Sequence, residues 1–205
     1  MEEALVKVKE SIDGLANKDA DAYATLIYGL VLSGIAMQFV GTSRPASGAE
    51  HHISHFIEMT VPVETCSALH GEKVGVGERM IVDLYHSIAA MSDGEIEKLL
   101  SSKPIADEDY IRKYFGALTP EILKENENDC AKEITNELIL SKLPEIRNII
   151  EKHLPKLSEI DEIYDTVGAR KTFTDIGLDE SFKDTVLSAA PLVRNRLTLL
   201  RLFKV

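Results

Sequence analysis

Four of the six histidines lie between positions 51 and 70, and their spacing could bring several imidazoles to one metal ion. His51, His52 and His55 fall on one short predicted helix, and His70 stands at the entrance to the next. Imidazole is the usual nitrogen ligand of zinc, and side chains three or four residues apart share a helix face. Spacing alone favours His51 with His55, closely followed by His52 with His55. His51 and His52 diverge by about 100° and cannot both face the same ion.

These histidines could instead be ordinary polar surface. The remainder of their helix is apolar, which places the rings near a semi-buried face. His70 also opens the following helix, where two antiparallel helices would bring their ends together. Both observations favour a binding site.

Two further segments could hold an anion. Arg44, Ser43 and Ser47 lie just ahead of the histidine helix, and a guanidinium with hydroxyls at a helix N-terminus suits a phosphate. An ordinary capped turn with a surface arginine explains this segment equally well. After His70, three glycines in seven residues could cradle a phosphate or permit close helix packing.

The elements that must position these residues are helices. Apolar residues recur at three- and four-residue spacing along most of the chain, which predicts an all-α fold, a helical bundle in a single domain covering residues 1–205. No strand, glycine-rich loop and helix follow one another, so no nucleotide-binding unit is expected. Predicted helices cover a first segment near residues 5–15, then 22–40, 49–60, 72–91, 93–101, 107–114, 120–125, 131–153, 158–166, 179–188 and 192–202.

The apolar run at 22–40 is interrupted by small and polar residues, which is atypical of a membrane span, and we expect it to be a buried core helix. The chain carries 23 basic and 34 acidic side chains and a formal charge of -11. Such a surface repels nucleic acid and anionic lipid, so neither is an expected partner. Two distant cysteines fit a reducing, cytoplasmic location.

Three motifs and the tail resemble one enzyme family. The strings SGIAM at 33–37, GTSRPASGAEHHISHF at 41–56, LHGEKVG at 69–75 and VRNRLTLL at 193–200 resemble sn-glycerol-1-phosphate dehydrogenases. That family shares a superfamily with glycerol dehydrogenases, iron-containing alcohol dehydrogenases and dehydroquinate synthases. Its members combine an N-terminal α/β domain for NAD(P) with a C-terminal helical domain that holds a divalent metal. The resemblance covers the helical domain only, and the nucleotide-binding domain is absent from this chain.

The resemblance also implies roles for individual residues. Two histidines and one aspartate hold the family's metal, and the histidines fall on His52 and His70, which overrules the pair favoured by spacing. His55 then lies beside the substrate and the nicotinamide and is the candidate catalytic residue. The family's aspartate lies upstream of anything present here, so the third ligand is not located. Arg44 and Lys73 are the candidates for the substrate phosphate.

The resemblance implies an NAD(P)-dependent oxidoreductase of phospholipid metabolism that interconverts dihydroxyacetone phosphate and sn-glycerol 1-phosphate. This chain alone is expected to be inactive. Zinc is the expected metal, with iron or nickel as alternatives, and NAD or NADP would bind only with the missing N-terminal half. Expected partners are a small phosphorylated substrate, that missing half and further copies of the chain. The alternatives are a glycerol dehydrogenase, a dehydroquinate synthase-like domain, or a non-catalytic stand-alone helical module.

Overall fold

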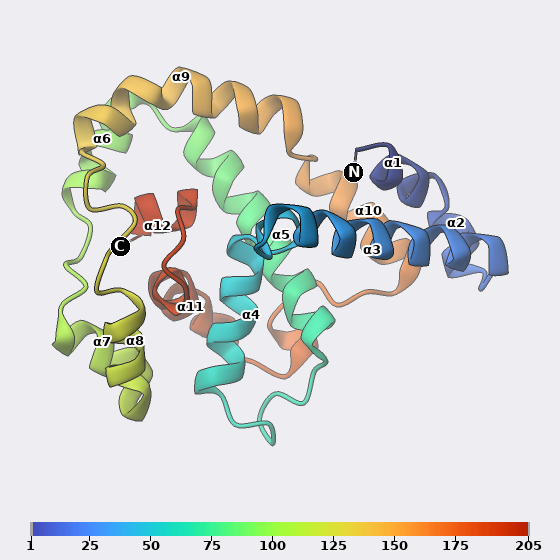
Figure 1. Ribbon diagram of the computed structural model, residues 1–205, viewed down its shortest axis with the longest axis horizontal. Helices are drawn as coiled ribbons and strands as arrows, with labels where there is room; N and C mark the ends of the chain where they lie inside the picture. The colour runs from blue at the N-terminus through green and yellow to red at the C-terminus, as the bar shows by residue number, and fades with distance from the viewer. Residues whose placement is uncertain (1, 205) are drawn as a thin grey trace.

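The computed structural model describes residues 2–204, and its arrangement confirms the all-α prediction, because no strand occurs in that range (Figure 1). The α-helices are α1 (Glu2–Glu10), α2 (Ile12–Ala16), α3 (Ala20–Val40), α4 (Ala49–Thr60), α5 (His70–Ala90), α6 (Asp93–Ser101), α7 (Glu108–Phe115), α8 (Thr119–Glu125), α9 (Asn136–His153), α10 (Leu157–Val167), α11 (Lys183–Ala189) and α12 (Leu199–Lys204). Short 3-10 helices lie at η1 (Arg44–Ala46), η2 (Gly116–Leu118), η3 (Thr174–Ile176), η4 (Glu180–Phe182) and η5 (Ala190–Val193).

The centre of the fold is the pair α4 and α5, which lie side by side and carry the histidines (Figure 1). Ile53, Phe56 and Ile57 on one side of α4 are fully buried in a core that also takes residues from α5, α7, α8, α11 and η5. Gly77 of α5 allows the two helices to approach closely, since a Cβ there would lie 2.8 Å from the carbonyl oxygen of Glu50. At this position the glycine serves helix packing, one of the two roles that the sequence left open.

A second, smaller core lies under the arch that α6 and α9 form in Figure 1. Ile88 at the end of α5 meets Leu143 of α9 and Phe203 of α12 there. Helix α9 continues through Pro144, and Pro155 lies between α9 and α10.

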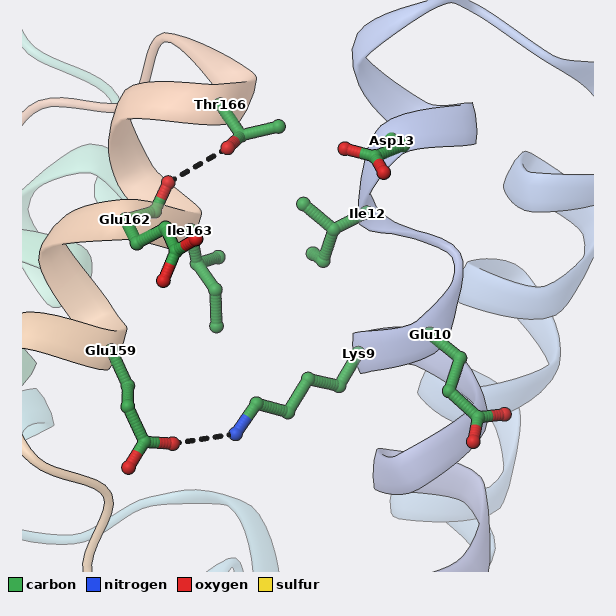
Figure 2. A pocket seen from close by; sticks show the side chains of 8 residues that line it. All are labelled: Lys9, Glu10, Ile12, Asp13, Glu159, Glu162, Ile163 and Thr166. Atoms are coloured by element: carbon green, nitrogen blue, oxygen red, sulfur yellow. Dashed lines mark hydrogen bonds and ion pairs between the residues drawn. The ribbon is translucent and has the colours of Figure 1, made fainter.

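Helices α1 and α2 pack against α3, and α2 also contacts α10. Figure 2 shows α10 facing α1 and α2 across a cavity of about 270 Å³, which is bridged by the ion pair of Lys9 with Glu159 at 2.8 Å. A second pair joins α5 to α10, in which the Arg79 guanidinium donates to both oxygens of Asp161 at 2.6 and 3.1 Å. These contacts attach the N-terminal helices to the body of the domain.

The expectation that α3 is a buried core helix is wrong. Asp19 caps its start and Gly41, at φ 71°, ends it. Among the described residues of this helix, Ala22 is the one that is buried. Apolar side chains such as Ile27 (59% exposed) and Phe39 (87% exposed) face outward. By length and composition α3 could also cross a membrane. An apolar helix face of this size in an otherwise packed domain indicates a surface that another structure covers.

The predicted closing helix is interrupted. Residues 190–193 form η5, residues 194–198 have no helical structure, and α12 then begins at Leu199. The interruption matters for function, because it places the two arginines of the VRNR string in a loop instead of on a helix face.

Candidate functional site: a histidine cluster beside an arginine pocket

Helices α4 and α5 bring three histidines and one glutamate together. His51 and His55 lie on one face of α4 and His70 is the first residue of α5. The His55 and His70 ring centroids are 5.4 Å apart, those of His51 and His70 are 5.5 Å apart, and those of His51 and His55 are 6.2 Å apart. Glu58, one turn after His55, completes the group: ligand atoms of His55, Glu58 and His70 all lie within 4.8 Å of one another.

In each of these three imidazoles, Nδ1 is hydrogen-bonded to a carboxylate. His51 Nδ1 lies 2.8 Å from Glu50 Oε1, while His55 Nδ1 and His70 Nδ1 lie 3.3 and 2.9 Å from the two oxygens of Glu58. In the described part of the chain no Nε2 of the three has a hydrogen-bond partner. A carboxylate on one ring nitrogen fixes the tautomer and raises the basicity of the other, which is the usual outer shell of a metal-binding histidine.

The protonation states also suit a metal. Partial burial would raise the pKa of Glu58, but hydrogen bonds and charges from His70, His55 and Lys73 outweigh this and hold that pKa below its usual range. Burial lowers the pKa of His55, against the opposing effect of Glu58. A metal requires ionised carboxylates and neutral imidazoles, and both shifts act in that direction.

The spacing of the rings agrees with this chemistry. A zinc ion about 2.1 Å from Nε2 lies about 3.2 Å from the ring centre, and two rings at a tetrahedral angle then have centres about 5.3 Å apart. The separations of 5.4 and 5.5 Å that involve His70 match this value, whereas 6.2 Å between His51 and His55 is wider. The residues present therefore fit a divalent metal.

His52 lies elsewhere. It lies on the buried side of α4, together with Ala49 and Phe56, and is 1% exposed. Neither of its ring nitrogens has a hydrogen-bond partner. Burial, and after it the nearby guanidinium of Arg196, lowers the pKa of His52 to about 4. A positive charge that opposes protonation also opposes a bound cation. The pairing of His52 with His70 thus stays a prediction from the resemblance, while the geometry brings His51 and His55 to His70.

The two phosphate candidates lie apart from each other. Lys73 is buried, and its Nζ lies 3.6 Å from Glu58 Oε1, at the edge of the histidine cluster. Arg44 is exposed in η1, and its side chain makes no hydrogen bond or ion pair within residues 2–204. The structure therefore does not bring Arg44 and Lys73 to one anion.

Sequence reasoning missed Glu58 and an arginine pocket. Glu58 follows His55 by three residues and His51 by seven, a spacing that could have placed all three on one helix face. The pocket has a volume of about 270 Å³ and is lined by Ser43, His55, Arg194 and Arg196, among others. Both arginines lie in the VRNR string, but no local pattern indicates that they pack against a histidine helix about 140 residues earlier.

Comparison with known proteins finds glycerol-1-phosphate dehydrogenases among the relatives. Glycerol-1-phosphate dehydrogenase of Bacillus licheniformis is 39% identical over 103 residues, which are 49% of this chain and 26% of the relative. The enzyme of the same name from Halalkalibacterium halodurans is 29% identical over 198 residues, or 96% of this chain and 41% of the relative. That of Methanosphaera stadtmanae is 39% identical over 75 residues, 37% of this chain and 21% of the relative.

No family model and no solved structure matches the chain. The relatives are much longer than this chain, which spans about two fifths of the two that align over nearly all of it. The match over nearly the whole chain confirms the resemblance seen in the motifs: this chain is similar to glycerol-1-phosphate dehydrogenases over part of their length.

Proposed function

We propose that the chain is the metal- and substrate-binding half of an NAD(P)-dependent glycerol-1-phosphate dehydrogenase, which interconverts dihydroxyacetone phosphate and sn-glycerol 1-phosphate. The observation that carries the proposal is the cluster of His51, His55 and His70, backed by carboxylates and bordering an arginine pocket. The relatives bear the name of this activity.

We assign the two imidazole ligands to His51 and His70, one residue away from the pair that the resemblance favoured. Glu50 and Glu58 hold their Nδ1 atoms, which leaves Nε2 as the ligand atom on each ring. Glu58 contacts Nδ1 of both His70 and His55, so it orients these rings from behind the ligand atoms. A divalent metal, with zinc as the expected ion, supplies a Lewis acid that polarises a substrate oxygen.

His55 has a different role in this proposal. Its ring borders both the histidine cluster and the arginine pocket, so it can touch a substrate that lies across the two. Its lowered pKa keeps the imidazole neutral at pH 7, and Glu58 orients it through Nδ1. A neutral, oriented imidazole can hydrogen-bond a substrate hydroxyl and accept its proton. Lys73, through its contact with Glu58, adds positive charge at the same place.

We propose that NAD or NADP binds to a separate domain, which corresponds to the part of the relatives that does not align with this chain. The exposed apolar face of α3, which includes Ile27 and Phe39, supports this division, because an interface with that part would bury it. A cytoplasmic location and a homo-oligomeric assembly are proposed from the resemblance alone.

A second candidate is a stand-alone helical module that binds metal without catalysis, for which the group of His55, Glu58 and His70 would be sufficient. One experiment separates the two. The nucleotide-binding half of the Halalkalibacterium halodurans relative is mixed with this chain, and oxidation of NADH by dihydroxyacetone phosphate is followed.

The dehydrogenase proposal predicts no cofactor binding by the chain alone, weak zinc binding by calorimetry, and turnover on mixing that His70→Ala removes. Turnover that survives both His51→Ala and His70→Ala would contradict the metal assignment. Zinc binding without turnover in any mixture would favour the stand-alone module.

A further inference from the structure

The pocket beside the histidine cluster is built from distant parts of the chain. Ser43 and Ser47 come from the segment before α4, His55 from α4 itself, and Arg194 and Arg196 from the loop between η5 and α12. The two arginines reach the pocket because residues 194–198 form a loop and not a helix.

The Arg196 guanidinium is oriented by hydrogen bonds to neutral groups, so no carboxylate neutralises its positive charge. Its Nη2 donates to Ser43 Oγ at 2.8 Å and its Nη1 donates to the Ser47 carbonyl at 3.3 Å. Both acceptors are neutral, and across residues 2–204 Arg196 has no carboxylate within ion-pair distance. A guanidinium that is oriented by neutral groups keeps its charge available for an anion.

Arg194 is similarly unpaired. Its side chain makes no hydrogen bond or ion pair with any part of the chain that the structure describes. The acidic side chain that lines the pocket, Glu125, accepts instead from the backbone N–H of Asn195 at 3.0 Å and so anchors the loop. In a chain with 34 acidic and 23 basic side chains, two arginines in one pocket that both lack a carboxylate partner are unusual.

Arg201, seven residues after Arg194, shows the contrast. It is 3% exposed, and its guanidinium is paired with Asp129 at 2.8 Å and with backbone carbonyls. That arginine ties α12 to the loop after α8 and has no free donors for a ligand. The structure thus separates a structural arginine from two that face a pocket.

We infer that Arg194 and Arg196, with the Ser43 hydroxyl, bind the phosphate of a phosphate monoester whose carbon end reaches His55 and the histidine cluster. The inference rests on the proposed function and names the residues that recognise its substrate class. Paired guanidinium groups suit a dianionic phosphate, because each can donate two parallel N–H groups to its oxygens. This assignment differs from Arg44 and Lys73, since Arg44 does not line the pocket and Lys73 lies against Glu58.

The test titrates inorganic phosphate into the 205-residue chain and follows backbone amide shifts by NMR, with glycerol as the neutral comparison. Arg194→Gln is the informative variant, because Arg194 is exposed and its loss should not disturb folding. Arg44→Gln is the matched control, because Arg44 is also an exposed arginine and is the other candidate for the phosphate. We expect shifts at Ser43, Ser47 and the 194–196 loop, with affinity at least ten-fold weaker in Arg194→Gln, about 1.4 kcal/mol, and unchanged in Arg44→Gln.

Weakening in Arg44→Gln with none in Arg194→Gln would overturn the inference, as would absence of any phosphate-dependent shift in the pocket. Zinc binding measured on the same samples separates this inference from the proposed function. Phosphate binding that fails while zinc binds at the histidines refutes the arginine site alone. Loss of zinc binding with phosphate retained refutes the metal assignment and leaves the anion site standing.

Discussion

Replacing His52 with leucine should stabilise the fold and leave zinc binding intact, whereas His51→Ala should weaken zinc binding. His52 is 1% exposed, and both of its ring nitrogens lack hydrogen-bond partners. A buried polar group without a partner costs about 1–3 kcal/mol, and leucine fills a similar volume without that cost. We expect a gain of about 1–2 kcal/mol for His52→Leu, and at least a hundred-fold loss of zinc affinity, about 2.7 kcal/mol, for His51→Ala.

The burial of His52 also predicts how the stability of the metal-free chain depends on pH. Burial lowers the pKa of His52 from 6.5 to about 4, so between these values the unfolded chain binds a proton that the folded chain does not. The stability contributed by the neutral imidazole is therefore present above pH 6.5 and is lost as the pH falls towards 4. A shift of this size corresponds to about 3 kcal/mol. His52→Leu should remove this part of the acid sensitivity.

Urea unfolding with a chelator at pH 7.0, 5.5 and 4.5 measures the stability, and calorimetry at pH 7 measures zinc binding. His70→Ala provides the reference for loss of a ligand. The reasoning is refuted if His52→Leu loses zinc as completely as His70→Ala and gains no stability. In that case His52, as the resemblance suggested, would be the metal ligand.

The other predictions concern helix packing at Gly77, stabilisation of the fold by bound zinc, and the exposed face of α3. Gly77→Ala should destabilise the domain by about 1–3 kcal/mol in a thermal melt, because its Cβ would meet the carbonyl of Glu50 at 2.8 Å, whereas Gly94→Ala, with no atom within 4 Å of its Cβ, should not. Zinc at a hundred times its Kd should stabilise the wild-type chain by about 2.7 kcal/mol, and an unshifted melt would contradict a site in the folded state. Ile27→Asp should leave the melt of the isolated chain unchanged and weaken its association with the nucleotide-binding half, and an unimpaired mixture would exclude α3 from that interface.

The sequence alone determined the class of fold and the region of the site. Apolar periodicity predicted the helices because it follows from the local geometry of the chain, and the limits of α4 at Ala49–Thr60 agree with the prediction. The expected end of the helix at 22–40 likewise agrees with the end of α3 at Val40. The histidine-rich segment and the motifs around it also indicated the resemblance to glycerol-1-phosphate dehydrogenases, since a motif is a property of neighbouring residues.

Tertiary structure decided which side of each helix meets which neighbour. Periodicity separates His51 from His52 by about 100°, but only the packing of α4 on η5 and α5 shows that His52 enters the core and His51 faces His70. Periodicity likewise marked α3 as apolar without showing that its neighbours leave most of it exposed. Arg196 meets Ser43 across 153 residues. A contact of that separation depends on the path of the whole chain, which no local pattern encodes.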